Sequence, residues 1–93
     1  MLSEIPKDLS KMSQKELDRE ICRVGMIAEL DAVNLYEQLA AMTDNQLIKK
    51  VLLDIAKEEK THVGEFQALL LMEDEEQVRE LAEGKEEVEE LKG

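Results

Sequence analysis

Two long helix-favouring segments separated by a break of only a few residues constrain this chain more than any other feature. The first is expected to run from Ser13 to about Met42, and the second from the break at 42–45 to about Met72. Leu, Ala, Glu, Lys and Gln fill both segments, and all are strong helix formers. Because so short a connection only allows the chain to turn back on itself, the sequence predicts an antiparallel helical hairpin.

Capping motifs mark the starts of both helices. Ser13 and Glu16 have the spacing of a capping box, in which each side chain accepts a hydrogen bond from the other residue's backbone. Thr43 and Gln46 repeat this spacing, so we expect Thr43 to cap the second helix. The sequence has no alternating β-branched run, and we therefore assign an all-α fold without strands.

The hairpin accounts for residues 13–72, and two shorter segments flank it. Residues 1–12 are expected to form an irregular N-terminal arm. Residues 73–93 are expected to form a short acidic C-terminal helix or tail, because the acidic run at 73–76 suits the N-terminal turn of a helix. Gly84 interrupts the thin apolar stripe of this helix, so we expect its far end to fray.

The formal net charge of −11 limits the partners, and the single cysteine bears on the compartment. We expect neither nucleic acid nor a membrane as a partner, because both attract basic surfaces, whereas cations are natural partners. No stretch is apolar enough to span a bilayer, and the first residues do not resemble a signal peptide. One unpaired cysteine fits a reducing cytosol, and Cys22 is expected to be a small buried residue.

Apolar residues cover more than one face of the predicted helices, most clearly between Met26 and Met42. A two-helix hairpin buries only one stripe on each helix, so the remaining apolar area needs another chain. We therefore expect an obligate oligomer, in which pairing of two hairpins completes a four-helix bundle.

Two glutamates occupy positions where core residues are expected. Glu29 has small or apolar neighbours on its helix face, and Glu59 lies among apolar residues with His62 three positions later. Carboxylates are rarely left bare in a core, so they pair, become neutral or bind a cation. With Asp44 as the turn centre, Glu29 and Glu59 are equally far from the turn and are expected at the same height.

These three residues form half of a carboxylate-bridged di-iron site, which takes a Glu from each of two helices and Glu-x-x-His from each of two others. Two chains related by a two-fold axis would supply all six ligands, giving one centre per dimer. A Glu-x-x-His pair alone is weak evidence in so acidic a chain. Its apolar surroundings and the matched height of Glu29 strengthen it, and oxygen-rich donors favour iron or manganese over structural zinc.

At these residues the chain resembles the encapsulated ferritins, the half-ferritin cargo of encapsulin nanocompartments. The resemblance covers residues 21–71 and rests on ELDAVNLY at 29–36 and EEKTH at 58–62. It implies that Glu29, Glu59 and His62 are the ferroxidase ligands. It also implies that Tyr36 lies near the metal centre, and that Asp31 belongs to a secondary acidic site through which metal enters.

Two positions depart from the family pattern. The acidic partner of Asp31 is replaced by Ala28, which puts the secondary site in doubt. The tryptophan that commonly precedes the tyrosine is replaced by Leu35, which removes an aromatic neighbour but no ligand.

The resemblance further implies a function and an assembly. Dimers would form a ring, typically a decamer, that oxidises Fe(II) to Fe(III) with dioxygen and passes iron into a surrounding encapsulin shell in the cytoplasm. Members reach the shell through a C-terminal peptide or by fusion to the shell protein. Residues 90–93 do not match the expected peptide, so free cargo and a piece of a fusion both stay open.

Two other functions stay open from the residues alone. The acidic hairpin would be a purely structural module that oligomerises or docks onto a partner, with Glu29 neutral or paired to a lysine. Alternatively, it would be a non-catalytic metal binder whose oligomer is assembled by the ion.

Overall fold

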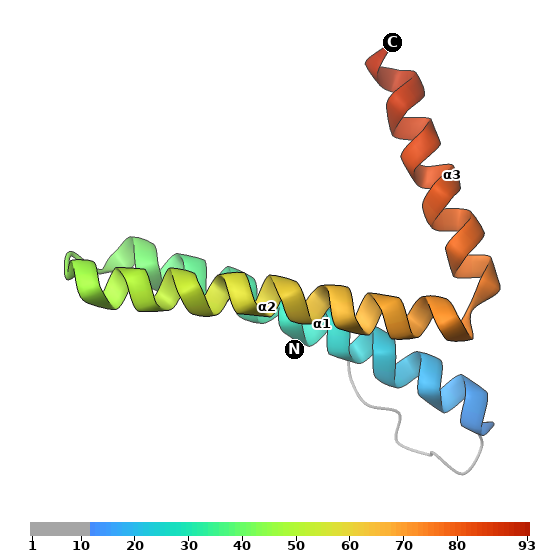
Figure 1. Ribbon diagram of the computed structural model, residues 1–93, viewed down its shortest axis with the longest axis horizontal. Helices are drawn as coiled ribbons and strands as arrows, with labels where there is room; N and C mark the ends of the chain where they lie inside the picture. The colour runs from blue at the N-terminus through green and yellow to red at the C-terminus, as the bar shows by residue number, and fades with distance from the viewer. Residues whose placement is uncertain (1–11) are drawn as a thin grey trace.

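The computed structural model describes residues 12–93 as three helices (Figure 1). Helix α1 spans Gln14–Met42, α2 spans Gln46–Glu73 and α3 spans Glu75–Lys92. Helices α1 and α2 form the predicted antiparallel hairpin, and α3 leaves the end of α2 in a new direction (Figure 1). The described part of the chain has no strand, so the predicted all-α class is confirmed. The predicted arm at 1–12 lies outside the described residues, Met12 apart.

The start of α1 matches its prediction. Ser13 Oγ accepts a hydrogen bond from the backbone N–H of Glu16 at 3.1 Å. Glu16 Oε2 accepts in turn from the backbone N–H of Ser13 at 3.3 Å. The capping box therefore satisfies N–H groups that have no partner within the helix.

The cap predicted for α2 is wrong by two residues, because Asn45 and not Thr43 is the N-cap. Asn45 Oδ1 accepts from the backbone N–H groups of Leu47 at 3.0 Å and Ile48 at 3.1 Å. Thr43 ends α1 instead, and its hydroxyl accepts from the N–H of Asn45 at 3.1 Å. Asparagine is a better N-cap than threonine, and here its amide oxygen reaches two donors at once.

Each long helix turns one seam of side chains toward the other, at the alternating spacing of four and three residues found in coiled coils. Every seam position is buried or half-buried, and two of them are acidic. The seam of α1 is Cys22, Met26, Glu29, Val33, Tyr36 and Ala40, and that of α2 is Leu52, Ala56, Glu59, Val63, Phe66 and Leu70.

The hairpin alone has a thin core. Among the described residues, the buried apolar side chains are Cys22, Val33, Ala40, Ala56 and Leu70. Cys22 is free and 7% exposed, as predicted, and burial raises the pKa of its thiol, with the nearby carboxylates adding to the rise. Many large apolar side chains stay exposed on both long helices, including Ile21, Leu35, Leu39, Ile48, Val51 and Leu69.

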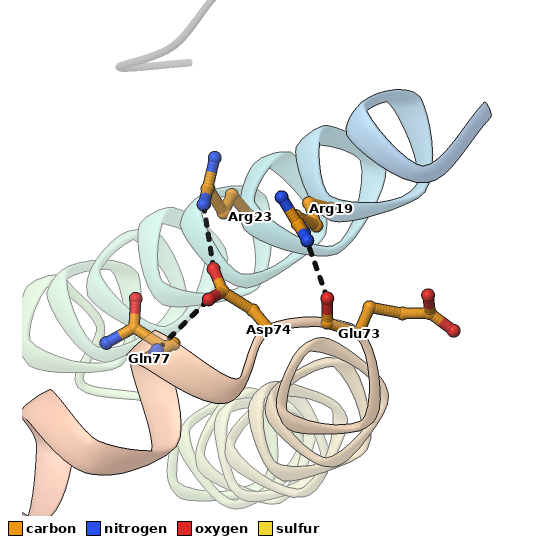
Figure 2. Close-up of polar contacts among 5 residues, drawn as sticks. All are labelled: Arg19, Arg23, Glu73, Asp74 and Gln77. Carbon is orange, nitrogen blue, oxygen red and sulfur yellow. Dashed lines mark hydrogen bonds and ion pairs between the residues drawn. The ribbon is translucent and has the colours of Figure 1, made fainter. Parts of the chain in front are cut away.

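The direction of α3 is set at a polar corner (Figure 2). Asp74 accepts from the backbone N–H of Gln77 at 3.0 Å and thereby caps α3. Its other carboxylate oxygen pairs with Arg23 of α1 at 3.0 Å (Figure 2). Arg19 Nε donates to the carbonyl oxygen of Glu73 at 2.9 Å, so two arginines of α1 hold the last residues of the hairpin. The Gln77 N–H and the two arginines lower the pKa of Asp74.

Helix α3 continues through Gly84 to Lys92, so the far end that was expected to fray is helical. A single glycine costs about 1 kcal/mol in a helix interior, and the helix-favouring residues around it outweigh that cost. Within the described residues, no helix is long and apolar enough to cross a membrane.

Candidate metal centre

The structure brings Glu29, Glu59 and His62 together between α1 and α2. His62 Nδ1 lies 3.3 Å from Glu29 Oε2 and 3.4 Å from Glu59 Oε2. One donor atom from each residue lies within 4.8 Å of the other two. Among the described residues this is the one group of three or more His, Cys, Asp or Glu side chains with such spacing.

The helix register differs from the prediction by about one turn. Glu29 faces His62 and Gly25 faces Phe66, and the midpoint of both pairs lies between Asn45 and Gln46. The turn centre is therefore later than Asp44, and Glu29 is level with His62 instead of Glu59. The trio still forms, because Glu59 and His62 are three residues apart and share a face of α2.

The two carboxylates and the imidazole differ in their surroundings. The side chains of Glu29 and Glu59 occupy seam positions and are 21% and 19% exposed, whereas that of His62 is 45% exposed. His62 lies beside the seam, at seven-residue spacing from Ile55 and Leu69, so it belongs to an apolar flank of α2. We call this side of the hairpin the His62 face. A hollow on it is lined by Glu29, His62, Glu65, Phe66 and Leu69.

The donor set fits a hard or borderline cation. Four carboxylate oxygens and one imidazole can converge on a small volume, and iron and manganese accept this mixture of oxygen and nitrogen. Two carboxylates so close together repel each other, so a bound cation would relieve that repulsion. Three side chains leave open positions on any ion, and the exposed His62 face gives access to them.

Neither Tyr36 nor Asp31 belongs to the trio, and the two residues differ in their positions on α1. Tyr36 is half-buried on the seam of α1, two turns closer to the hairpin connection than Glu29. Asp31 is exposed and two residues from Glu29, which places it about 200° around the helix. Ala28 is half-buried, and Leu35 is 51% exposed.

A contact one turn from the trio was not predicted from the sequence. A Cβ atom added to Gly25 would lie 2.6 Å from the ring of Phe66. Gly25 lies four residues before Glu29, and Phe66 lies four residues after His62, so the glycine–aromatic contact is stacked directly beside the Glu29–His62 contact. A glycine inside a strongly helical segment is the signal that could have suggested this close approach.

A hairpin that supplies two helices and half of a carboxylate–histidine set defines a half-ferritin-like protein. The sequence agrees, since residues 4–79 match the EncFtn-like family, and the chain therefore belongs to that family. The chain is also similar to a solved structure, the encapsulated ferritin domain from Pyrococcus furiosus. The two share 54% identity with a TM-score of 0.84, over 98% of this chain and 95% of the other.

Two curated relatives link the family to encapsulins. The ferritin-like–encapsulin shell fusion protein of P. furiosus is 60% identical over 85% of this chain and 23% of its own length. The encapsulin nanocompartment cargo protein EncC of Myxococcus xanthus is 42% identical over 72% of this chain and 51% of its own. The chain thus spans about a quarter of the first relative and about half of the second.

Proposed function

We propose that this protein is a ferroxidase, in which two chains build one centre that oxidises Fe(II) to Fe(III). The observation that carries the proposal is the convergence of donor atoms of Glu29, Glu59 and His62 within 4.8 Å of one another, on a face that carries several exposed apolar side chains. Family membership supports iron as the substrate. A second copy related by a two-fold axis would double the three donors to six, the number that a di-iron carboxylate site uses.

The chemistry follows from the donors. Two Fe(II) ions held side by side give up one electron each, and dioxygen takes both electrons with two protons to become hydrogen peroxide. Anionic carboxylates from Glu29 and Glu59 stabilise Fe(III) more than Fe(II), which favours loss of the electron. His62 would supply a nitrogen ligand from α2, the helix that also carries Glu59. Once a second copy covers this face, the apolar flank around His62 would limit the access of water.

The His62 face supports pairing of the chains through this same site. Its exposed apolar residues are Ile21, Leu35 and Leu39 on α1 and Ile48, Val51 and Leu69 on α2. Their exposed fractions lie between 37% and 53%, so a hairpin in isolation leaves much apolar area in water. Covering this face with a second copy would bury that area and bring two trios together.

Two neighbouring residues have proposed supporting roles. Tyr36, two turns from Glu29 on the same seam, would order a ligand by a hydrogen bond or donate an electron to the centre. Asp31 would attract cations toward the site, helped by the net charge of −11. Its position on a different side of α1 and the alanine at position 28 both argue for attraction at a distance instead of a second built site.

The names of the relatives support a proposal for where the reaction takes place. A chain similar to an encapsulin cargo protein and to a shell fusion would work inside an encapsulin compartment, where the shell receives the ferric product. A ring of dimers, as in the decamer expected from the family, would present several such centres to the interior.

Iron oxidation tests the proposal. Fe(II) added without oxygen and then exposed to air should give a ferric absorbance rise, and His62→Ala or Glu59→Ala should abolish it. Asp54→Ala is the matched control, because it removes an exposed carboxylate of α2 that lies about 140° around the helix from Glu59, and this variant should oxidise iron at the parent rate. Variants at 59 and 62 that retain the parent rate would refute the site. Binding without oxidation would favour the non-catalytic metal binder.

A further inference from the structure

A close approach of α1 and α2 beside the trio depends on a glycine. A Cβ at Gly25 would lie 2.6 Å from Cδ1 and Cε1 of Phe66, and 2.8 Å from Cγ. Carbon atoms attract best at about 3.5–4.0 Å, so an added methyl group needs a displacement of about 1 Å. The clash includes Cγ, the root of the ring, so rotation of the ring about its own axis does not remove it.

The other glycines inside the helices have no such contact. A Cβ at Gly64 in α2 or at Gly84 in α3 would meet no atom within 4 Å. Glycine in a helix interior is less favourable than alanine by roughly 0.5–1 kcal/mol. At position 25 this cost permits a close contact that the methyl group of alanine would block. Gly25 lets the ring of Phe66 lie directly against the backbone of α1.

The contact is placed where it affects the donor atoms. One turn along α1 from Gly25 is Glu29, and one turn back along α2 from Phe66 is His62, 3.3 Å from Glu29. Phe66 also lines the hollow that contains Glu29 and His62. A change in helix separation at the glycine–aromatic contact is therefore transmitted over a single turn to the Glu29–His62 distance.

We propose that Gly25 and Phe66 form a spacer that sets the separation of α1 and α2 at the trio, which makes Gly25 a positioning residue for metal binding. This inference rests on the proposed function. The ring thickness of Phe66 and the missing side chain of Gly25 together fix how far the carboxylate of α1 stands from the donors of α2. Residues that orient ligands without touching the metal typically change its affinity by about 10–100-fold.

Co(II) is a suitable probe, because it is stable in air and its visible spectrum reports ligand geometry. Gly25→Ala should weaken Co(II) binding at least about tenfold and alter the spectrum. Gly64→Ala is the matched control, since it adds the same methyl group to a helix and meets no atom. Its affinity and spectrum should equal those of the parent, and far-UV circular dichroism checks that each variant is helical.

A second substitution separates spacing from general damage. Phe66→Leu removes the ring and should also weaken binding, whereas Gly25→Ala with Phe66→Leu should bind more tightly than either single variant, because the new methyl group occupies space that the ring vacates. If Gly25→Ala alone does not fold, the Co(II) affinities of Phe66→Leu and the double variant still test the spacer. A double variant that binds no better than Phe66→Leu would overturn the spacer.

The remaining outcomes distinguish this inference from the proposed function. A parent protein that binds no Co(II) and no Fe(II) overturns the metal centre, and the spacer with it. A parent that binds Co(II) while a folded Gly25→Ala binds it equally, with the same spectrum, overturns the spacer alone.

Discussion

Leu69 and Leu53 form a matched pair for testing which side of the hairpin meets a second chain. Their side chains are almost equally exposed, at 49% and 47%. Leu69 lines the hollow with Glu29 and His62. Leu53 lies about 160° further around α2, beside Lys49 on the other side of the hairpin. Only Leu69 should be covered when two His62 faces pair.

The expected effect follows from these exposures. Full burial of a leucine side chain stabilises by about 1.5–3 kcal/mol, and the hairpin already covers half of Leu69. Pairing would therefore recover about 1 kcal/mol from each Leu69. A two-fold pair contains the residue twice, so Leu69→Ala should cost about 2 kcal/mol, which raises the dimer dissociation constant about 30-fold.

Sedimentation equilibrium of the metal-free protein measures this constant. Leu53→Ala should leave the pair that holds the metal intact, with unchanged Co(II) affinity, even if larger assemblies are affected. Equal weakening of the pair by both substitutions, or by Leu53→Ala alone, would show that the hairpins do not meet through the His62 face.

Two further predictions concern the helix ends. Asn45→Ala should lower the free energy of unfolding by about 1 kcal/mol in urea titrations, and more than Thr43→Ala does, because Asn45 accepts two backbone N–H groups; an equal loss would contradict the cap assignment. The pKa of Asp74 is lowered, so its stabilising contribution is complete above the ordinary value of 3.8 and is lost as the pH falls through the lowered pKa. The stability difference between the parent and Asp74→Asn should therefore shrink in acid, and a difference independent of pH would refute a role for the Asp74 charge.

The sequence predicted the parts of the fold that depend on local chemistry. The capping box at Ser13 needs only neighbouring residues, and the structure contains it. Glu29 and Glu59 could be recognised as seam residues from their spacing alone, because apolar residues at helical intervals surround both. The convergence with His62 followed from the short connection, which leaves the two helices only an antiparallel arrangement.

Two kinds of feature could not be predicted from the sequence. In one, two residues compete for the same role; the other depends on contacts between residues far apart in the sequence. Thr43 and Asn45 both have side chains suited to capping, and the geometry of the turn decides between them. That choice shifts the turn centre, which explains why Glu29 is level with His62 instead of Glu59. The Gly25–Phe66 contact depends on the same register, and the pairing of Arg23 with Asp74 joins residues far apart in sequence. The division of the chain into an arm, a hairpin and a tail stays a prediction.

Native mass spectrometry during a Co(II) titration tests the central claim most directly, since it counts chains and ions in the same particle. A centre shared between two chains predicts that tightly bound ions appear in pairs, on dimers or multiples of dimers, and that His62→Ala removes them. Single chains that bind an ion as tightly as dimers do, or dimers that hold the same number of ions without His62, would contradict the account.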